Sequence, residues 1–196
     1  MKFKSYLIVI IVYLISASNL YAIDPEIFVQ STVNRASKIL SEDISKEKKM
    51  LELQKIAKDT VDIKGIGFYT LGSIRKNLDE NQKNEYGKLF EKYFLKSFSS
   101  RLAEYTNPEI DVIGKDTLNE KYTIVNSLLK GTAERPEIKI DWRIYTKNKD
   151  KPLIRDLIIE GLSLARTQKE EFNSVLQSNN NDITELFKTL KSFITN

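Results

Sequence analysis

Residues 136–172 constrain the fold most strongly, because a strand period, a loop and a helical period follow one another there. Apolar side chains alternate with charged ones from Ile138 to Ile144, and this period of two is typical of a β-strand with one buried face. A polar loop over residues 147–151 leads into a second strand over residues 153–159, where apolar residues occupy both parities. This pattern predicts a strand that is covered on both faces.

The end of this second strand predicts a helix and raises a chemical question. After Gly161 the apolar spacing becomes helical, with Ser163 as the expected N-cap of a helix over residues 163–176. Asp156 lies in the middle of the apolar strand, and a buried carboxylate needs a partner or a function. A structural ion pair or hydrogen bond, for instance to Arg155, Arg166 or a backbone amide, is one explanation. A role as a catalytic base is the other.

The first 22 residues differ in character from the rest of the chain. Two lysines precede an apolar run from Tyr6 to Ala17, which is shorter than the roughly 20 residues of a membrane span. We expect residues 1–22 to be a secretory signal peptide cleaved near Ala22, and residues 23–196 to form one domain. The alternative is an uncleaved signal anchor, because Leu20 is larger than the small residue usually found three positions before the cut.

The composition excludes several kinds of chemistry. The chain contains no cysteine and no histidine, so disulfides, thiolate nucleophiles, imidazole bases and zinc sites of the usual kind are ruled out. Without the two lysines of residues 1–22, the net charge falls from +4 to +2. No dense basic block with interleaved aromatic residues occurs, which argues against nucleic-acid binding.

The remaining segments predict an α+β domain. Besides the helix already described, helical spacing is found over residues 24–42, 45–61, 78–105 and 182–194. Strand patterns occur at residues 109–113 and 121–129, ahead of the hairpin. Along the chain, helices come first, four strands follow in succession, and helices come last. This order predicts one four-stranded antiparallel sheet packed against several helices.

The segment over residues 62–72 is short and apolar and contains Gly65 and Gly67. Each glycine costs a helix about 1 kcal/mol relative to alanine, so two of them predict a close approach of the backbone or a bend. The spacing argues against a phosphate-binding loop, because no strand precedes the segment and no Gly-Lys-Ser/Thr follows it.

The helix over residues 78–105 carries an unusually bulky apolar face. Its inward positions are Tyr86, Leu89, Phe90, Tyr93, Phe94, Ser97, Phe98, Leu102 and Tyr105. Such a stripe either packs as an ordinary core or lines a cavity that is too large for its own side chains to fill.

Two groups of residues, in order along the chain, resemble one known family. The first comprises Asp62-Ile63, Leu71-Gly72 and Asn81-Gln82, followed by the aromatic run of the long helix. The second comprises Asp156, Glu160-Gly161, Ser163 and Phe172, which match a D-x-x-x-E-G-x-S element and the aromatic residue of the helix after it. Over residues 26–192 the chain thus resembles the MlaC family, also called the toluene-tolerance auxiliary family.

The resemblance implies a fold, a cargo and partners. The fold would be a roll related to cystatin-like and ketosteroid-isomerase-like domains, with phospholipid tails held in an apolar cavity between helices and sheet. The partners would be an inner-membrane Mla ABC transporter complex and an outer-membrane Mla lipoprotein complex, and the location would be the periplasm. We expect a monomer that carries phospholipid as cargo and uses no cofactor and no metal.

Sequestering lipid tails sets the requirements for the cavity wall. A diacyl phospholipid has about 30 methylenes, and at ~0.8 kcal/mol each their exposure to water would cost on the order of 24 kcal/mol. Only an internal apolar cavity offsets this cost, with large side chains that can shift aside. We predict as its wall Phe68, Leu71, Phe90, Phe94, Phe98, Ile140, Trp142, Ile144 and Ile158, although ordinary core packing explains each of them equally well.

Three hypotheses about function follow. The first is a non-enzymatic carrier that shuttles phospholipid between outer-membrane and inner-membrane Mla complexes and so maintains outer-membrane lipid asymmetry. The second is a small-molecule enzyme of ketosteroid-isomerase-like shape, with Asp141 or Asp156 as the base and Tyr93 as the proton donor. The third is a structural interaction module with a filled core.

Overall fold

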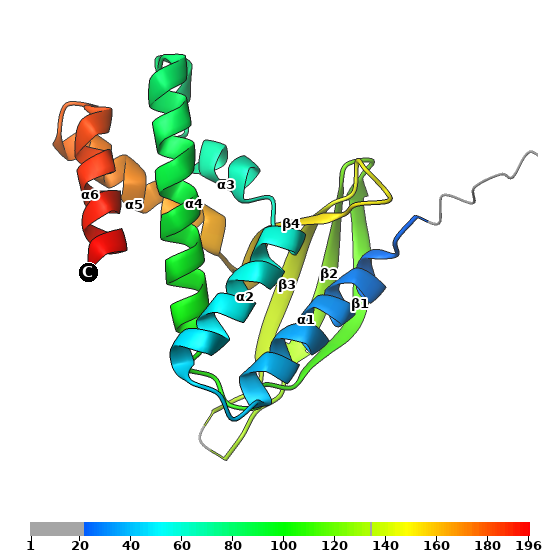
Figure 1. Ribbon diagram of the computed structural model, residues 1–196. Coiled ribbons are helices and arrows are strands. Elements are labelled where there is room, and N and C mark those ends of the chain that lie inside the picture. Colours follow the sequence, from blue (N-terminus) through cyan, green and yellow to red (C-terminus); the bar gives the residue numbers. More distant parts are fainter. Residues whose placement is uncertain (1–21, 134) are drawn as a thin grey trace, which may run out of the picture.

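The computed structural model describes residues 22–133 and 135–196, so the predicted signal peptide lies, apart from Ala22, outside the described residues. The helices are α1 (Pro25–Ser41), α2 (Lys46–Thr60), α3 (Ile63–Thr70), the short 3₁₀ helix η1 (Ile74–Lys76), α4 (Glu80–Leu102), α5 (Leu164–Ser178) and α6 (Ile183–Thr195). Helix α1 crosses the sheet, α2 follows it toward α4, and α3, α5 and α6 gather around the far half of α4 (Figure 1). In this part of the chain, no helix combines the length and the apolar character needed to cross a membrane.

The strands form one antiparallel meander, which confirms the predicted α+β class. They are β1 (Ile110–Asn119), β2 (Tyr122–Leu129), β3 (Ile138–Tyr145), β4 (Leu153–Ile159) and β5 (Leu162–Ser163), paired in this order. Four long strands were expected, and the fifth has only two residues, too few for a period of two to reveal. Strand β1 continues past the expected end at Ile113. The prediction ended there because the second half of the strand is exposed and carries no apolar alternation.

The strand at the centre of the prediction has the expected two faces. Ile140, Trp142 and Ile144 are buried on β3, whereas Asp141 and Arg143 between them are half-buried and Lys139 is exposed. Strand β4 differs from the expectation of full coverage, because only Ile154 and Asp156 are buried and its other residues are half-buried. Helices α1 and α2 lie on the same side of the sheet (Figure 1), and the half-buried residues of β4 are found on both of its faces.

The paired glycines of α3 allow two close contacts that a side chain would prevent. A Cβ atom at Gly65 would lie 2.6 Å from Cζ of Arg155, and one at Gly67 would lie 2.7 Å from the ring of Phe90. Arg155 donates a hydrogen bond to the carboxylate of Asp62, which also accepts the backbone N–H of Gly65 at 2.8 Å and caps α3. The glycines therefore let α3 pack tightly between β4 and α4, as the sequence predicted.

Candidate functional site

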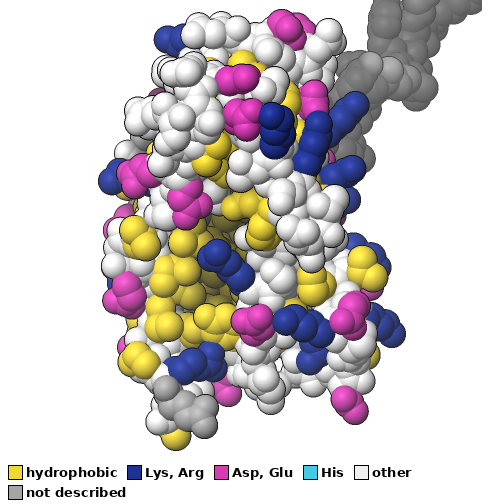
Figure 2. All heavy atoms as spheres, turned by 90° about the vertical axis from the view of Figure 1, so that its left-hand side faces the viewer, with side chains coloured by type: hydrophobic (Ala, Val, Ile, Leu, Met, Phe, Trp, Pro, Cys, Tyr) yellow, Lys and Arg dark blue, Asp and Glu magenta, His cyan; other side chains and the backbone are white. Residues whose placement is uncertain are grey.

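A cavity of about 430 Å³ lies between the helices and the inner face of the sheet. Residues of α1, α2, α4 and α5 form its sides, and residues of β3 and β4 form its floor. On the surface, a hollow walled by hydrophobic side chains is visible (Figure 2). Voids in ordinary cores rarely exceed one water molecule, whereas ligand sites measure about 300–1,000 Å³. The bulky face of α4 therefore lines a cavity of ligand size.

Five of the nine predicted wall residues line this cavity: Phe90, Phe94, Phe98, Ile140 and Trp142. The three phenylalanines stack along α4, with ring centroids 6.1 Å apart between Phe90 and Phe94 and 5.6 Å apart between Phe94 and Phe98. The indole N–H of Trp142 donates to the hydroxyl of Ser127 at 2.8 Å. Because this polar atom has a partner on the neighbouring strand, the rest of the ring can serve as apolar wall.

The other four predicted residues do not line the cavity: Phe68, Leu71, Ile144 and Ile158. On α3 the lining residue is Ile66, and Phe68 lies two residues further along, on the opposite side of the helix. Leu71, at the C-cap of α3, is 3% exposed and belongs to the core.

The two isoleucines miss the cavity for different reasons. Ile144 is fully buried in the core beside its strand partner Ile154. Ile158 lies opposite Asp141, whereas its neighbours Leu157 and Ile159 line the cavity. Successive side chains of a strand point to opposite faces, so Ile158 points away from the cavity. Because both odd and even positions of β4 carry apolar residues, the sequence pattern did not indicate which of them face the cavity.

Much of the wall comes from α1 and α2, which the prediction of site residues did not include. The lining residues on these helices are Thr32, Val33, Ala36, Ser37, Leu40, Leu53, Ile56, Ala57 and Thr60. The apolar period of both helices correctly marked an inward face. Apolar residues have the same helical spacing whether they pack against other side chains or face an empty cavity. The spacing therefore could not identify these residues as part of the cavity wall.

The rim of the cavity carries polar groups from α4 and α5. The hydroxyl of Tyr93 on α4 donates to Oε1 of Gln168 on α5 at 2.8 Å, and this bond ties the two helices together. Burial raises the pKa of the Tyr93 phenol above its ordinary value, and the negative charge of Glu171 raises it further. The phenol therefore stays neutral and keeps its proton for this bond. Arg101 and Glu171 also line the cavity.

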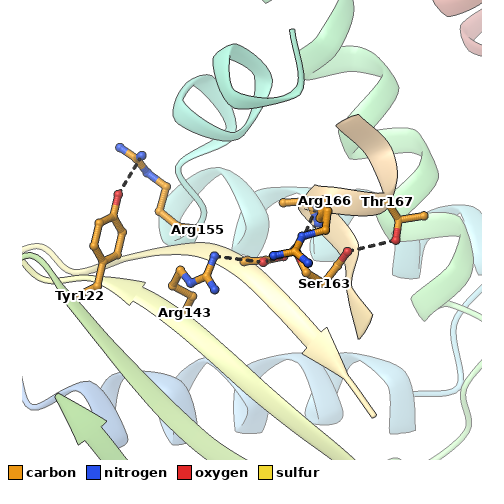
Figure 3. Close-up of polar contacts among 8 residues, drawn as sticks. Tyr122, Arg143, Arg155, Ser163, Arg166 and Thr167 are labelled. Atoms are coloured by element: carbon orange, nitrogen blue, oxygen red, sulfur yellow. Dashed lines mark hydrogen bonds and ion pairs between the residues drawn. The ribbon is translucent and has the colours of Figure 1, made fainter. Parts of the chain in front are cut away.

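Asp156 is 3% exposed, and both of its oxygens accept hydrogen bonds at the start of α5. One oxygen accepts the backbone N–H of Ala165 at 2.9 Å, and the other accepts the hydroxyl of Ser163 at 2.6 Å. The guanidinium of Arg143 on β3 lies 3.5 Å from the second oxygen. Figure 3 shows Arg143 and Ser163 on either side of this junction between the sheet and α5. The buried carboxylate thus joins β4 to the first turn of α5.

The remaining residues of the D-x-x-x-E-G-x-S element build the turn that brings Ser163 to Asp156. Glu160 and Gly161 have φ angles of 49° and 82°, and they connect β4 to β5 by a tight turn. Two successive residues with positive φ are typical of hairpin turns in which glycine is favoured. Ser163 also caps α5, because its hydroxyl accepts the backbone N–H of Arg166 at 3.1 Å. The whole element therefore has a structural explanation.

The described residues do not assemble the catalytic arrangement of the enzyme hypothesis. Asp156 is fully occupied by donors, and the Tyr93 hydroxyl is directed to Gln168. Asp141 bonds to Asn126 at 3.0 Å and lies on the same side of the sheet as Ile158, away from the cavity. Over residues 22–133 and 135–196, no group of three or more Asp or Glu side chains could hold a metal ion.

Comparison with known proteins identifies the family of the chain. A sequence model of the MlaC protein family matches residues 30–192. The chain belongs to the MlaC family. The sequence resemblance is therefore confirmed, and the match runs from α1 to α6, so that it includes every element that contributes to the cavity wall.

A solved structure shares the fold of this MlaC chain. It is a phospholipid-binding protein from Ralstonia solanacearum, determined in complex with a phospholipid, with a TM-score of 0.74 and 16% sequence identity. The similarity covers 88% of this chain and 97% of that protein. A search of curated proteins found no match.

Proposed function

We propose that this protein is a periplasmic carrier that holds a phospholipid by its acyl chains inside the cavity and moves it between membrane complexes. The observation that carries the proposal is the apolar cavity of about 430 Å³ in a chain of the MlaC family. A shared fold with a protein solved in complex with a phospholipid supports the same cargo.

The physical basis is the removal of lipid tails from water. Each methylene that enters the apolar cavity gains about 0.8 kcal/mol, so a tail of many methylenes is held without any polar contact. The aromatic rings of Phe94 and Phe98 are half-buried, which leaves them room to move as tails enter. Such binding does not change the cargo chemically, and this agrees with the structural role of Asp156.

Membership of the family suggests the route that we propose. The lipid would pass between an outer-membrane lipoprotein complex and an inner-membrane ABC transporter complex of the Mla pathway, and this exchange would maintain outer-membrane lipid asymmetry. Residues 1–22 would direct export and be removed near Ala22, which leaves a monomeric carrier.

Uptake from membranes tests the proposal. Delipidated protein is mixed with vesicles that contain a radiolabelled phospholipid, and the vesicles are then removed by centrifugation. We expect intact labelled lipid in the supernatant, in an amount that rises with protein concentration to one lipid per chain. A supernatant no richer in label than buffer would contradict the carrier, and label recovered as hydrolysis products would favour the enzyme.

A further inference from the structure

One basic side chain at the cavity forms no ion pair with a carboxylate of residues 22–133 or 135–196. Arg101, in the last turn of α4, is exposed and is the only Lys or Arg among the described residues that line the cavity. It lies two helical turns from Tyr93, about 12 Å along the helix axis. Its positive charge still acts on Tyr93, where it lowers the pKa of the phenol against the raising effects of burial and Glu171.

Three other arginines of the described chain form ion pairs, and Arg101 forms none. Arg35 pairs with Asp59 at 3.0 Å, and Arg143 and Arg155 pair with Asp156 and Asp62. Within the described residues, no carboxylate lies close enough to Arg101 to form an ion pair. The nearby Glu104 pairs instead with Lys46, at 3.3 Å. A guanidinium at an apolar cavity that forms no ion pair in the described part of the chain is available to an anion from a ligand.

The chemistry of the cargo supplies that anion. In a glycerophospholipid the phosphate is joined through glycerol to both tails, so it must lie near the cavity opening when the tails lie inside. The planar guanidinium of arginine can donate two parallel hydrogen bonds to a phosphate. The carboxylate of Glu171, contributed by α5, would repel the phosphate and so favour the α4 side.

We propose that Arg101 binds the phosphate of the phospholipid whose tails fill the cavity, an inference that rests on the proposed carrier function. The phosphate is common to all glycerophospholipids. Arg101 would therefore select phospholipids as a class against neutral diacylglycerol, and it would not distinguish one headgroup from another.

The test compares a phospholipid with a lipid that has the same tails and no phosphate. Delipidated protein is incubated with vesicles that contain phosphatidylglycerol and diacylglycerol of equal chain length, and the bound lipids are extracted and quantified. Arg101→Gln is expected to lower bound phosphatidylglycerol roughly tenfold, because a charge-assisted hydrogen bond is lost. The loss for diacylglycerol should stay below about twofold, and Arg101→Lys should retain most of the phospholipid binding.

A matched control is available on α5. Arg166 is exposed and does not line the cavity, so Arg166→Gln should bind both lipids as the unmodified protein does. An Arg101→Gln protein that binds phosphatidylglycerol normally would overturn the role of Arg101 while the carrier function stands. If the unmodified protein takes up neither lipid, the carrier function fails and the inference fails with it.

A competition experiment distinguishes binding of a lipid phosphate from binding of free phosphate. Millimolar inorganic phosphate should not displace phosphatidylglycerol, since the tails hold the lipid in the cavity. Displacement by inorganic phosphate alone, abolished by Arg101→Gln, would assign Arg101 to free phosphate and overturn its assignment to the lipid. Circular dichroism of each variant verifies the fold, which an exposed residue at the end of α4 should leave intact.

Discussion

Ser97→Trp is expected to remove nearly all of the lipid that purifies with the protein. Ser97 lines the cavity on α4, between Tyr93 and Arg101, and is only half-buried, so an indole at this position can extend into the empty space. If the ring excludes three methylenes, at ~0.8 kcal/mol each, binding weakens by about 2.4 kcal/mol, or roughly fiftyfold. Lipid phosphorus in an organic extract, measured per mole of purified protein, reports the loss.

A serine one turn along the same helix provides the control for this change. The hydroxyl of Ser100 donates to the backbone oxygen of Ser97 at 3.1 Å, and its side chain does not line the cavity. Ser100→Trp should therefore keep its lipid. Normal lipid content in a folded Ser97→Trp protein would show that the tails lie elsewhere.

Asp156→Asn is also expected to have a large effect, which is a loss of stability of the folded protein. The substitution removes the negative charge beside Arg143 and replaces one acceptor with an NH₂ group, which cannot accept from Ser163 or from the N–H of Ala165. Loss of a buried, fully bonded carboxylate should lower the free energy of unfolding by about 3 kcal/mol. Urea unfolding followed by circular dichroism measures this difference.

Asp141→Asn serves as the comparison, because Asp141 also lies in a strand and has polar partners. Its carboxylate accepts a hydrogen bond from the side-chain amide of Asn126 and lies 3.3 Å from the ammonium group of Lys139. Its ion pair is partly exposed, so the expected loss is below about 1 kcal/mol. The enzyme hypothesis predicts a different outcome for Asp156→Asn, namely unchanged stability with loss of a chemical activity. A variant with normal unfolding would therefore overturn the structural role assigned to Asp156.

Patterns that depend on a single element could be predicted from the sequence. Alternation over residues 138–144 identified β3 and its buried face, and Ser163 caps α5 as the helix-start pattern predicted. These features depend on neighbours within a few residues or on one repeated period. Local physical chemistry was sufficient for them.

Features that depend on how elements pack could not be predicted in the same way. Ile158 and Leu157 are both apolar residues of one strand, and only the position of the helices decides that Leu157 faces the cavity. Leu53 and Ile56 have the spacing of core residues, and nothing in that spacing reveals the empty space beside them. Arg101 lies in the same helix as the aromatic stripe, and that it forms no ion pair within the described residues becomes visible only in the three-dimensional structure.

The most direct test of the account is the mass of the mature protein purified without detergent, recorded by native mass spectrometry and again after organic extraction. The carrier function predicts one additional mass per chain, equal to that of a phospholipid, and recovery of the same intact lipid in the extract. The mass of the chain alone, with no uptake of lipid after incubation with phospholipid vesicles, would contradict it.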